Sequence, residues 1–164
     1  MALNRDFVGR EFPATEPFVV GREHVRDFVR AIGDSNPLYT DPDAARAAGY
    51  RDVVAPPTFL TVLQFRRTTT ALTDPALGLD YSRVVHGEQR FELTRPLCAG
   101  DEIVSVSRIS DIRDAGRNEL MTVETEVATT GGERIGKAVS TIVSRGTAAS
   151  KSGAYRAAPP GEKV

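Results

Sequence analysis

One apolar segment followed by a long stretch of alternating residues constrains the fold most. Residues 57–65 leave almost no polar face, so a helix in this segment must be buried. Its large apolar side chains are Phe59, Leu60, Val62, Leu63 and Phe65. From Arg83 onward the hydrophobic period drops to two, which is typical of strands. A sheet that curls around one central helix, an α+β architecture, is the solution that buries both apolar faces.

The spacing of the alternating segments predicts an antiparallel meander, because short turns rich in Gly, Asp and Asn separate them. The expected strands cover residues 83–93, 103–112, 120–129 and 134–144. In the first of them, alternation places Val85 with Phe91 on one face and His86 on the other. In the second, the alternation slips after Val106, as a β-bulge would cause. A curled sheet of this kind has an exposed edge, and pairing across a two-fold axis commonly covers it.

The N-terminal part predicts a short strand at residues 18–20 and two helices. The first helix begins at Arg22, carries an apolar stripe, and ends at Gly33, where a glycine commonly terminates a helix. The second is about two turns long, with Asp41 as its N-cap and Pro42 in its first turn. Asp41 therefore has a sufficient structural explanation.

The turn between these two helices holds the candidate catalytic groups Asp34 and Tyr39, together with Asn36. The proline after Asn36 pushes that residue out of the helical region, so the turn has a fixed shape. A fixed polar turn can hold a carboxylate and an amide at a set angle. Asp34 can either cap this turn through its side chain or take part in chemistry, and both readings remain open.

Length and composition predict one globular domain at residues 1–146 and a disordered tail at 147–164. The formal net charge is -1 and the basic residues are scattered, which argues against a nucleic-acid or membrane surface. No apolar run is long enough to span a membrane, and the first residues lack a signal-peptide core. Cys98 is the single cysteine, so a reducing, cytoplasmic location is expected.

Cofactors and metals are not expected. His24, His86 and Cys98 lie far apart in the sequence, which makes a metal site improbable. The chain also lacks a glycine-rich phosphate loop and a dinucleotide fingerprint.

Four motifs together resemble the MaoC-like dehydratase and (R)-specific enoyl-thioester hydratase family. They lie at residues 33–41, 55–59, 86–91 and 95–101. The likeness covers roughly residues 5–145 and is closest to the N-terminal-type members, which include the acyl-chain-binding subunits of (3R)-hydroxyacyl-ACP dehydratases. It implies a hot-dog fold.

The resemblance also implies where chemistry would occur. Active members carry an Asp and a His that activate the water added to, or lost from, the β-carbon. Asp34 and Asn36 match that motif, but Tyr39 stands where the His is expected, and a phenol is a poor general base at neutral pH. Pro56, Pro57 and Thr58 occupy the place of the His-Gly pair that opens the central helix in the family, so at least one N–H donor is missing.

The segment that begins at His86 resembles the cleft-lining segment of the non-catalytic halves. The resemblance makes His86, Gly87 and Gln89 substrate-binding candidates, together with Asn36, Pro57 and Thr58. A simpler reading is that His86 is a polar residue on the outer face of its strand. Gly87 within a strand indicates a bulge or a close backbone approach.

The leading functional hypothesis is a subunit of a (3R)-hydroxyacyl-thioester dehydratase or enoyl hydratase of fatty-acid metabolism. This chain would bind the acyl part of an acyl-ACP or acyl-CoA, and a second MaoC-like chain or a second copy would complete the site. One alternative is a weakly active homodimer that uses Asp34 and Tyr39, and another is a non-enzymatic acyl-thioester-binding module. A thioesterase ranks last, because no carboxylate lies between Thr58 and Leu72. Chain length and carrier remain open.

Overall fold

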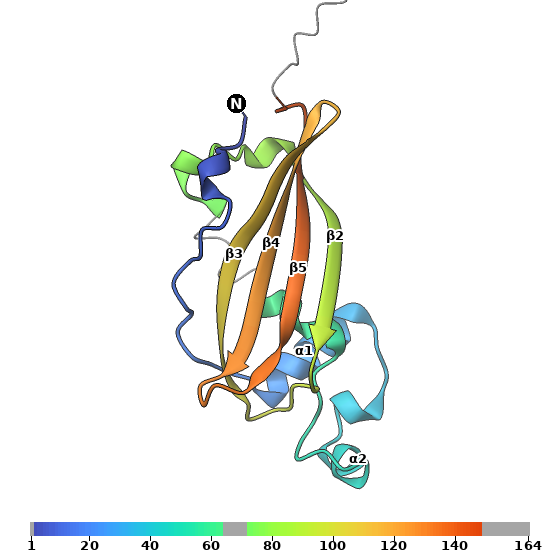
Figure 1. Cartoon of the computed structure of the whole chain (residues 1–164). Coiled ribbons are helices and arrows are strands. Elements are labelled where there is room, and N and C mark those ends of the chain that lie inside the picture. The colour runs from blue at the N-terminus through green and yellow to red at the C-terminus, as the bar shows by residue number, and fades with distance from the viewer. Residues whose placement is uncertain (1, 64–71, 149–164) are drawn as a thin grey trace, which may run out of the picture.

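The computed structural model describes residues 2–63 and 72–148. One antiparallel sheet dominates it, with the strand order β1-β3-β4-β5-β2 (Figure 1). The strands are β1 (Phe18–Val19), β2 (Val84–Leu93), β3 (Glu102–Ala115), β4 (Asn118–Thr129) and β5 (Arg134–Ser144). Helices α1 (Arg22–Ile32) and α2 (Pro42–Ala47) lie toward one end of the sheet. The predicted α+β meander is thus confirmed.

The predicted central helix begins as a 3₁₀ turn at Pro57–Phe59 and continues as α-helix at residues 60–63. The remainder of the predicted helix lies outside the described residues. Phe59, Leu60 and Leu63 are buried and share one apolar cluster with α1 and the inner face of the sheet. Burial of each such side chain contributes about 1.5–3 kcal/mol relative to leaving it in water. The helix start is therefore fixed by packing.

A second apolar cluster lies at the other end of the sheet, under the N-terminal segment. Leu3, Phe7 and Leu77 pack there against Ile109 and Met121 of the sheet. The two clusters cover the same inner face, because Ile103 and Ile109 of β3 belong to one cluster each.

The predicted bulge in β3 lies further along the strand than expected. Ile103, Ser105, Ser107 and Ile109 are all buried, so the alternation continues past Val106, and the register shifts between Ile109 and Asp111. The prediction was wrong because Ser105 and Ser107 face inward, where an apolar pattern expects aliphatic side chains. Ser107 is tolerated there because its hydroxyl lies 2.9 Å from the Thr125 hydroxyl, within hydrogen-bonding distance.

The predicted faces of β2 also need correction. His86 lies opposite the buried Ile142 of β5, and Gln89 lies opposite the buried Ser140, with a register shift between His86 and Glu88. Side chains of directly opposed residues share a face. His86 is therefore on the inner face with Gln89, and the reading that placed it on the outer face is wrong. The bulge at Gly87 reverses the alternation that the sequence pattern assumed.

The N-terminal elements follow the prediction. Helix α1 ends at Gly33, which adopts the left-handed conformation, and the Asp41 side chain caps α2 by accepting the Asp43 N–H. At the other end of the chain, Thr147 is buried and its hydroxyl bonds to Ser144, so ordered packing reaches two residues past the predicted domain boundary, to Ala148. Residues 149–164 of the predicted tail lie outside the described part.

None of the helices in the described part of the chain is long and apolar enough to cross a membrane.

Candidate functional site

The predicted catalytic turn is held together by its own polar side chains. Asp34 Oδ1 accepts the backbone N–H of Asn36 at 2.9 Å, and Asn36 Oδ1 accepts the N–H of Leu38 at 3.0 Å. Such side-chain-capped turns fix the backbone without requiring a ligand. The structural role that was open for Asp34 is present, and its carboxylate is also exposed to solvent. A role in chemistry stays a prediction.

Tyr39 lies in the 3₁₀ turn Pro37–Tyr39 that follows, and its half-buried ring packs against the apolar cluster around α1. Within the described residues, no hydrogen bond joins the Tyr39 hydroxyl to the Asp34 carboxylate. The two groups therefore do not form a bonded acid–base pair within this chain.

Pro57 and Thr58 are exposed at the start of the central helix. The segment before them is fixed by pairing with the loop between β2 and β3. The Ala55 N–H donates to the Leu97 carbonyl at 2.8 Å, and the Ala99 N–H donates to the Val53 carbonyl at 2.9 Å. This loop therefore sets the position from which the central helix begins.

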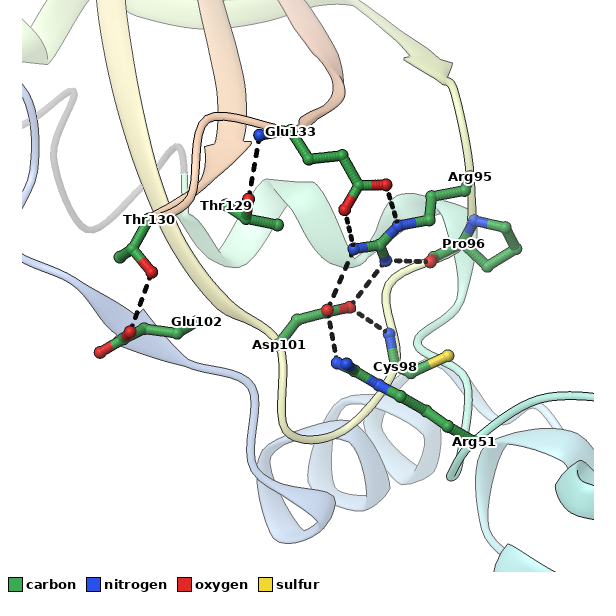
Figure 2. Close-up of polar contacts among 9 residues, drawn as sticks. All are labelled: Arg51, Arg95, Pro96, Cys98, Asp101, Glu102, Thr129, Thr130 and Glu133. Carbon is green, nitrogen blue, oxygen red and sulfur yellow. Dashed lines mark hydrogen bonds and ion pairs between the residues drawn. The ribbon is translucent and has the colours of Figure 1, made fainter.

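A buried carboxylate holds that loop in turn. Asp101 is 3% exposed and accepts the backbone N–H of Cys98 at 2.8 Å, as well as bonds from Arg95 and Arg51 (Figure 2). The Arg95 guanidinium lies between Asp101 and Glu133 and bonds to both carboxylates. A buried charge persists only when it is paired and hydrogen-bonded, and this one is both.

The contacts of Asp101 and Cys98 shift the pKa of each group. Burial alone would raise the pKa of Asp101, but the bonds from Arg95 and from the Cys98 N–H outweigh it, so the pKa of Asp101 is lowered. Burial, with the Asp101 charge, raises the pKa of the Cys98 thiol. Cys98 thus stays a protonated core thiol rather than a nucleophile.

A separate chain of polar side chains lies on the inner face at the β2 edge. The Ser140 hydroxyl donates to Gln89 Oε1, and His86 Nε2 lies 3.2 Å from the same oxygen. The Gln89 amide nitrogen donates to the Val139 carbonyl at 3.1 Å. We call His86, Gln89 and Ser140 the edge triad.

The structure therefore brings the predicted residues together in two groups. Asp34 and Asn36 share one turn, whereas His86 and Gln89 share the edge triad, and no hydrogen bond within the described residues joins the two groups. Sequence reasoning missed Ser140, although strand alternation with Ala138 and Ile142 would have placed it inward. In the described part of the chain, no group of His, Cys, Asp and Glu side chains is arranged to hold a metal ion.

Comparison with known proteins identifies relatives along almost the whole described chain. Residues 6–138 match the family model described as the FAS1-like dehydratase domain region. A UPF0336 protein of Parafrankia sp. is 55% identical over 148 residues, which are 90% of this chain and 98% of that protein. A UPF0336 protein of Streptomyces avermitilis is 49% identical over 145 residues, covering 88% and 97% of the two chains.

Solved structures resemble the fold closely. A chain of the C-terminally truncated HadBC (3R-hydroxyacyl-ACP dehydratase) complex of Mycobacterium tuberculosis superposes with a TM-score of 0.77 at 27% identity, over 86% of this chain and 99% of that one. A MaoC-like dehydratase gives a TM-score of 0.79 at 32% identity, over 85% of this chain but only 42% of that one. The predicted hot-dog fold is confirmed.

Proposed function

The chain belongs to the FAS1-like dehydratase-region family within the MaoC-like hot-dog proteins, and we propose that it is the acyl-binding subunit of a (3R)-hydroxyacyl-thioester dehydratase or enoyl hydratase. In this proposal the substrate is an acyl-ACP or acyl-CoA of cytoplasmic fatty-acid metabolism. A second hot-dog chain supplies the Asp and His that complete the site.

The observation that carries the proposal is the combination of an open sheet edge with an incomplete acid–base set. Strand β2 has ten residues and pairs only with β5 among the described residues, and its Val85 and Leu93 side chains are exposed. A long, open, partly apolar edge favours pairing with another chain. The similarity to one chain of the two-protein HadBC complex supports the same arrangement.

The chemistry explains why a partner is needed. Dehydration removes an α-proton and expels the β-hydroxyl, so a base and an acid must act on one small site. Here Asp34 already uses one oxygen to build its turn, and Tyr39 offers a phenol in place of the imidazole. The residues of this chain can orient a thioester, but they do not provide the pair that moves the protons.

Space for an apolar chain is available beside the central helix. A cavity of about 140 Å³ lies between the N-terminal segment, β3 and the helix start, and its lining includes Phe18, Leu63 and Ile103. Apolar side chains with a few polar groups are the usual lining of a ligand site. This cavity supports an acyl-binding role for the chain.

The direct test compares the chain alone with the assembled pair. Purified alone, it should hydrate crotonyl-CoA negligibly, because it lacks the acid–base pair. Co-expression with a MaoC-like chain that has an intact Asp and His should restore hydration by at least about a hundredfold, the contribution typical of acid–base catalysis. Ready turnover by the isolated chain would contradict the proposal.

The Asp34→Asn variant separates the proposal from a homodimer that uses Asp34 and Tyr39. In the proposed assembly, activity should be nearly unchanged, because the amide oxygen of the new side chain can still accept the Asn36 N–H. Asp41→Asn is a matched control, since Asp41 accepts the Asp43 N–H in the same geometry. Loss of activity in the Asp34 variant, but not in the Asp41 variant, would favour the homodimer.

A further inference from the structure

The hydrogen bonds of the edge triad determine which atoms of Gln89 face which neighbours. The Gln89 Nε2 position lies 3.1 Å from the Val139 carbonyl oxygen and 3.5 Å from the Arg90 carbonyl oxygen. Carbonyl oxygens only accept, so the amide nitrogen must occupy this position. The Gln89 Oε1 atom therefore faces Ser140 and His86, and it accepts from the Ser140 hydroxyl.

This arrangement selects one tautomer of His86. The Oε1 atom of Gln89 is an acceptor and lies 3.2 Å from His86 Nε2, so the imidazole must carry its proton on Nε2. In the neutral ring the other nitrogen, Nδ1, then has a free lone pair. Within residues 2–63 and 72–148, no other hydrogen bond or ion pair reaches the His86 ring.

The position of the ring makes this free acceptor accessible. The bulge at Gly87 turns His86 onto the inner face of the sheet, yet the side chain remains exposed because β2 is the open edge. An exposed imidazole nitrogen without a protein partner can accept a hydrogen bond from water or from a ligand. Here Nε2 is bonded to Gln89, which is itself bonded to Ser140, and Nδ1 is presented to whatever occupies the inner face at the edge.

We propose that His86 Nδ1 accepts a hydrogen bond from the bound acyl thioester, and that Gln89 and Ser140 are positioning residues that hold the imidazole in the Nε2–H form. This inference rests on the proposed function for the identity of the ligand. Two donors lie near the thioester group of such a ligand: the 3-hydroxyl of a 3-hydroxyacyl chain and the nearest amide N–H of the pantetheine arm.

The tautomer can be measured on the chain alone. The protein has only two histidines, His24 and His86, so a His24→Gln variant labelled with ¹⁵N leaves a single imidazole to observe. We expect the His86 ring to show a protonated Nε2 and an unprotonated Nδ1 at a pH where it is neutral. A spectrum with the proton on Nδ1 would overturn the inference whatever the function of the chain.

Two substitutions then separate ligand binding from a purely structural role. His86→Asn can place an amide oxygen close to the Nδ1 position, so it keeps the acceptor. His86→Gln can place an amide nitrogen close to Nε2, so it keeps the bond to Gln89 but loses the acceptor. We expect the Asn variant to bind thioester nearly as well as the wild type and the Gln variant to bind about fivefold more weakly. The reverse order would show a structural role and refute the proposal.

A matched pair of ligands identifies the donor. Binding of 3-hydroxyoctanoyl-CoA and of octanoyl-CoA to the assembled protein is measured by calorimetry. If the 3-hydroxyl is the donor, the His86→Gln substitution weakens binding of the hydroxylated ligand only. If the pantetheine amide is the donor, the same substitution weakens binding of both ligands equally. If the wild type and the His86→Gln variant bind each of the two ligands with the same affinity, the inference is refuted.

The experiments also distinguish failure of the inference from failure of the proposed function. If the wild-type assembly binds neither thioester, acyl thioesters are not its ligands, and both the proposed function and the inference fail. If the assembly binds thioester and the His86→Gln substitution does not change the affinity, only the inference fails. A Ser140→Ala variant should weaken binding by less than His86→Gln, because Gln89 and its bond to His86 remain.

Discussion

The β3 edge and the β2 edge of the sheet carry different neighbours. Along β3, the N-terminal segment supplies hydrogen bonds from Gly9 to Ile109, from Phe12 to Ser107 and from Thr15 to Ser105. Strand β1 then pairs with the beginning of β3. Along β2, which is ten residues long, no strand of the described chain pairs on the side away from β5.

The difference shows that the described part of the chain closes one edge with its own backbone and leaves the other open. An unpaired edge invites association, and natural proteins usually blunt it. Here β2 instead carries the edge triad on its inner face and exposed Val85 on its outer face. The cavity proposed for the acyl chain lies at the closed edge, whereas the open edge is where association with a second chain and the proposed contact of His86 are expected.

Asp101 should carry the largest single contribution to the closed edge. Its backbone carbonyl accepts the Val20 N–H at 2.8 Å, and its side chain holds the loop that precedes β3. We expect Asp101→Asn to lower the free energy of unfolding by about 3 kcal/mol, because a buried and paired charge is removed. Urea denaturation measures the loss. Glu133→Gln, which removes an exposed partner of Arg95, is the control and should cost less than about 1 kcal/mol.

Attachment of β2 to β5 should depend on Gly136. A Cβ atom at this position would lie 2.3 Å from the Glu92 carbonyl oxygen and 3.1 Å from the Leu93 Cα, so the two strands would have to separate. We expect Gly136→Ala to destabilise the protein by about 2 kcal/mol. At Gly131 the nearest atom lies at 3.7 Å. A thermal melt in which Gly131→Ala is as damaging would show that the close approach does not matter.

A charge at the open edge should break association without unfolding the chain. We expect Val85→Lys to weaken assembly with the partner chain by about tenfold or more, which corresponds to about 1.4 kcal/mol. Val19→Lys is the matched control, because Val19 is also exposed but lies on the closed edge. Analytical ultracentrifugation of both variants checks the difference. Equal effects would remove the distinction between the edges.

Adding one methyl group at Gly87, in the bulge that turns His86 inward, should destabilise the protein. A Cβ atom on Gly87 would lie 3.0 Å from Val143 Cγ2 and 3.2 Å from the Thr141 carbonyl oxygen. We expect Gly87→Ala to cost about 1 kcal/mol of stability by overpacking. The additional Val143→Ala substitution should recover part of it. If Gly87→Ala is neutral in denaturation experiments, the bulge does not need a glycine.

Lowering the pH should gradually remove the stabilisation that the Asp101 carboxylate gives to the fold. Its pKa is lower in the folded chain than the ordinary value of 3.8, so its ionised form stabilises the fold above that value. That contribution is lost as the pH falls through the lower folded pKa. The difference in unfolding free energy between the wild type and Asp101→Asn should therefore be constant from pH 7 to about pH 5 and shrink below about pH 4. A difference that does not change with pH would assign the effect to packing.

The sequence alone determined the architecture because periodicity is a local property. The apolar segment at 57–63 and the hairpin spacing of the strands predicted a helix start packed on an antiparallel meander, and both are present. Asp41 and Gly33 set helix ends through contacts a few residues away. The motif resemblance likewise predicted the fold and family that the comparisons show.

Only the tertiary structure decided what the polar residues do. The side on which His86 lies depends on a one-residue bulge opposite β5, and its tautomer depends on Ser140 and Val139, which lie far away along the chain. The inward Ser107 is likewise explained by Thr125 on the next strand. Alternation assigns faces only while the register is regular, and hydrogen-bond partners across a sheet follow from pairing that no local pattern contains.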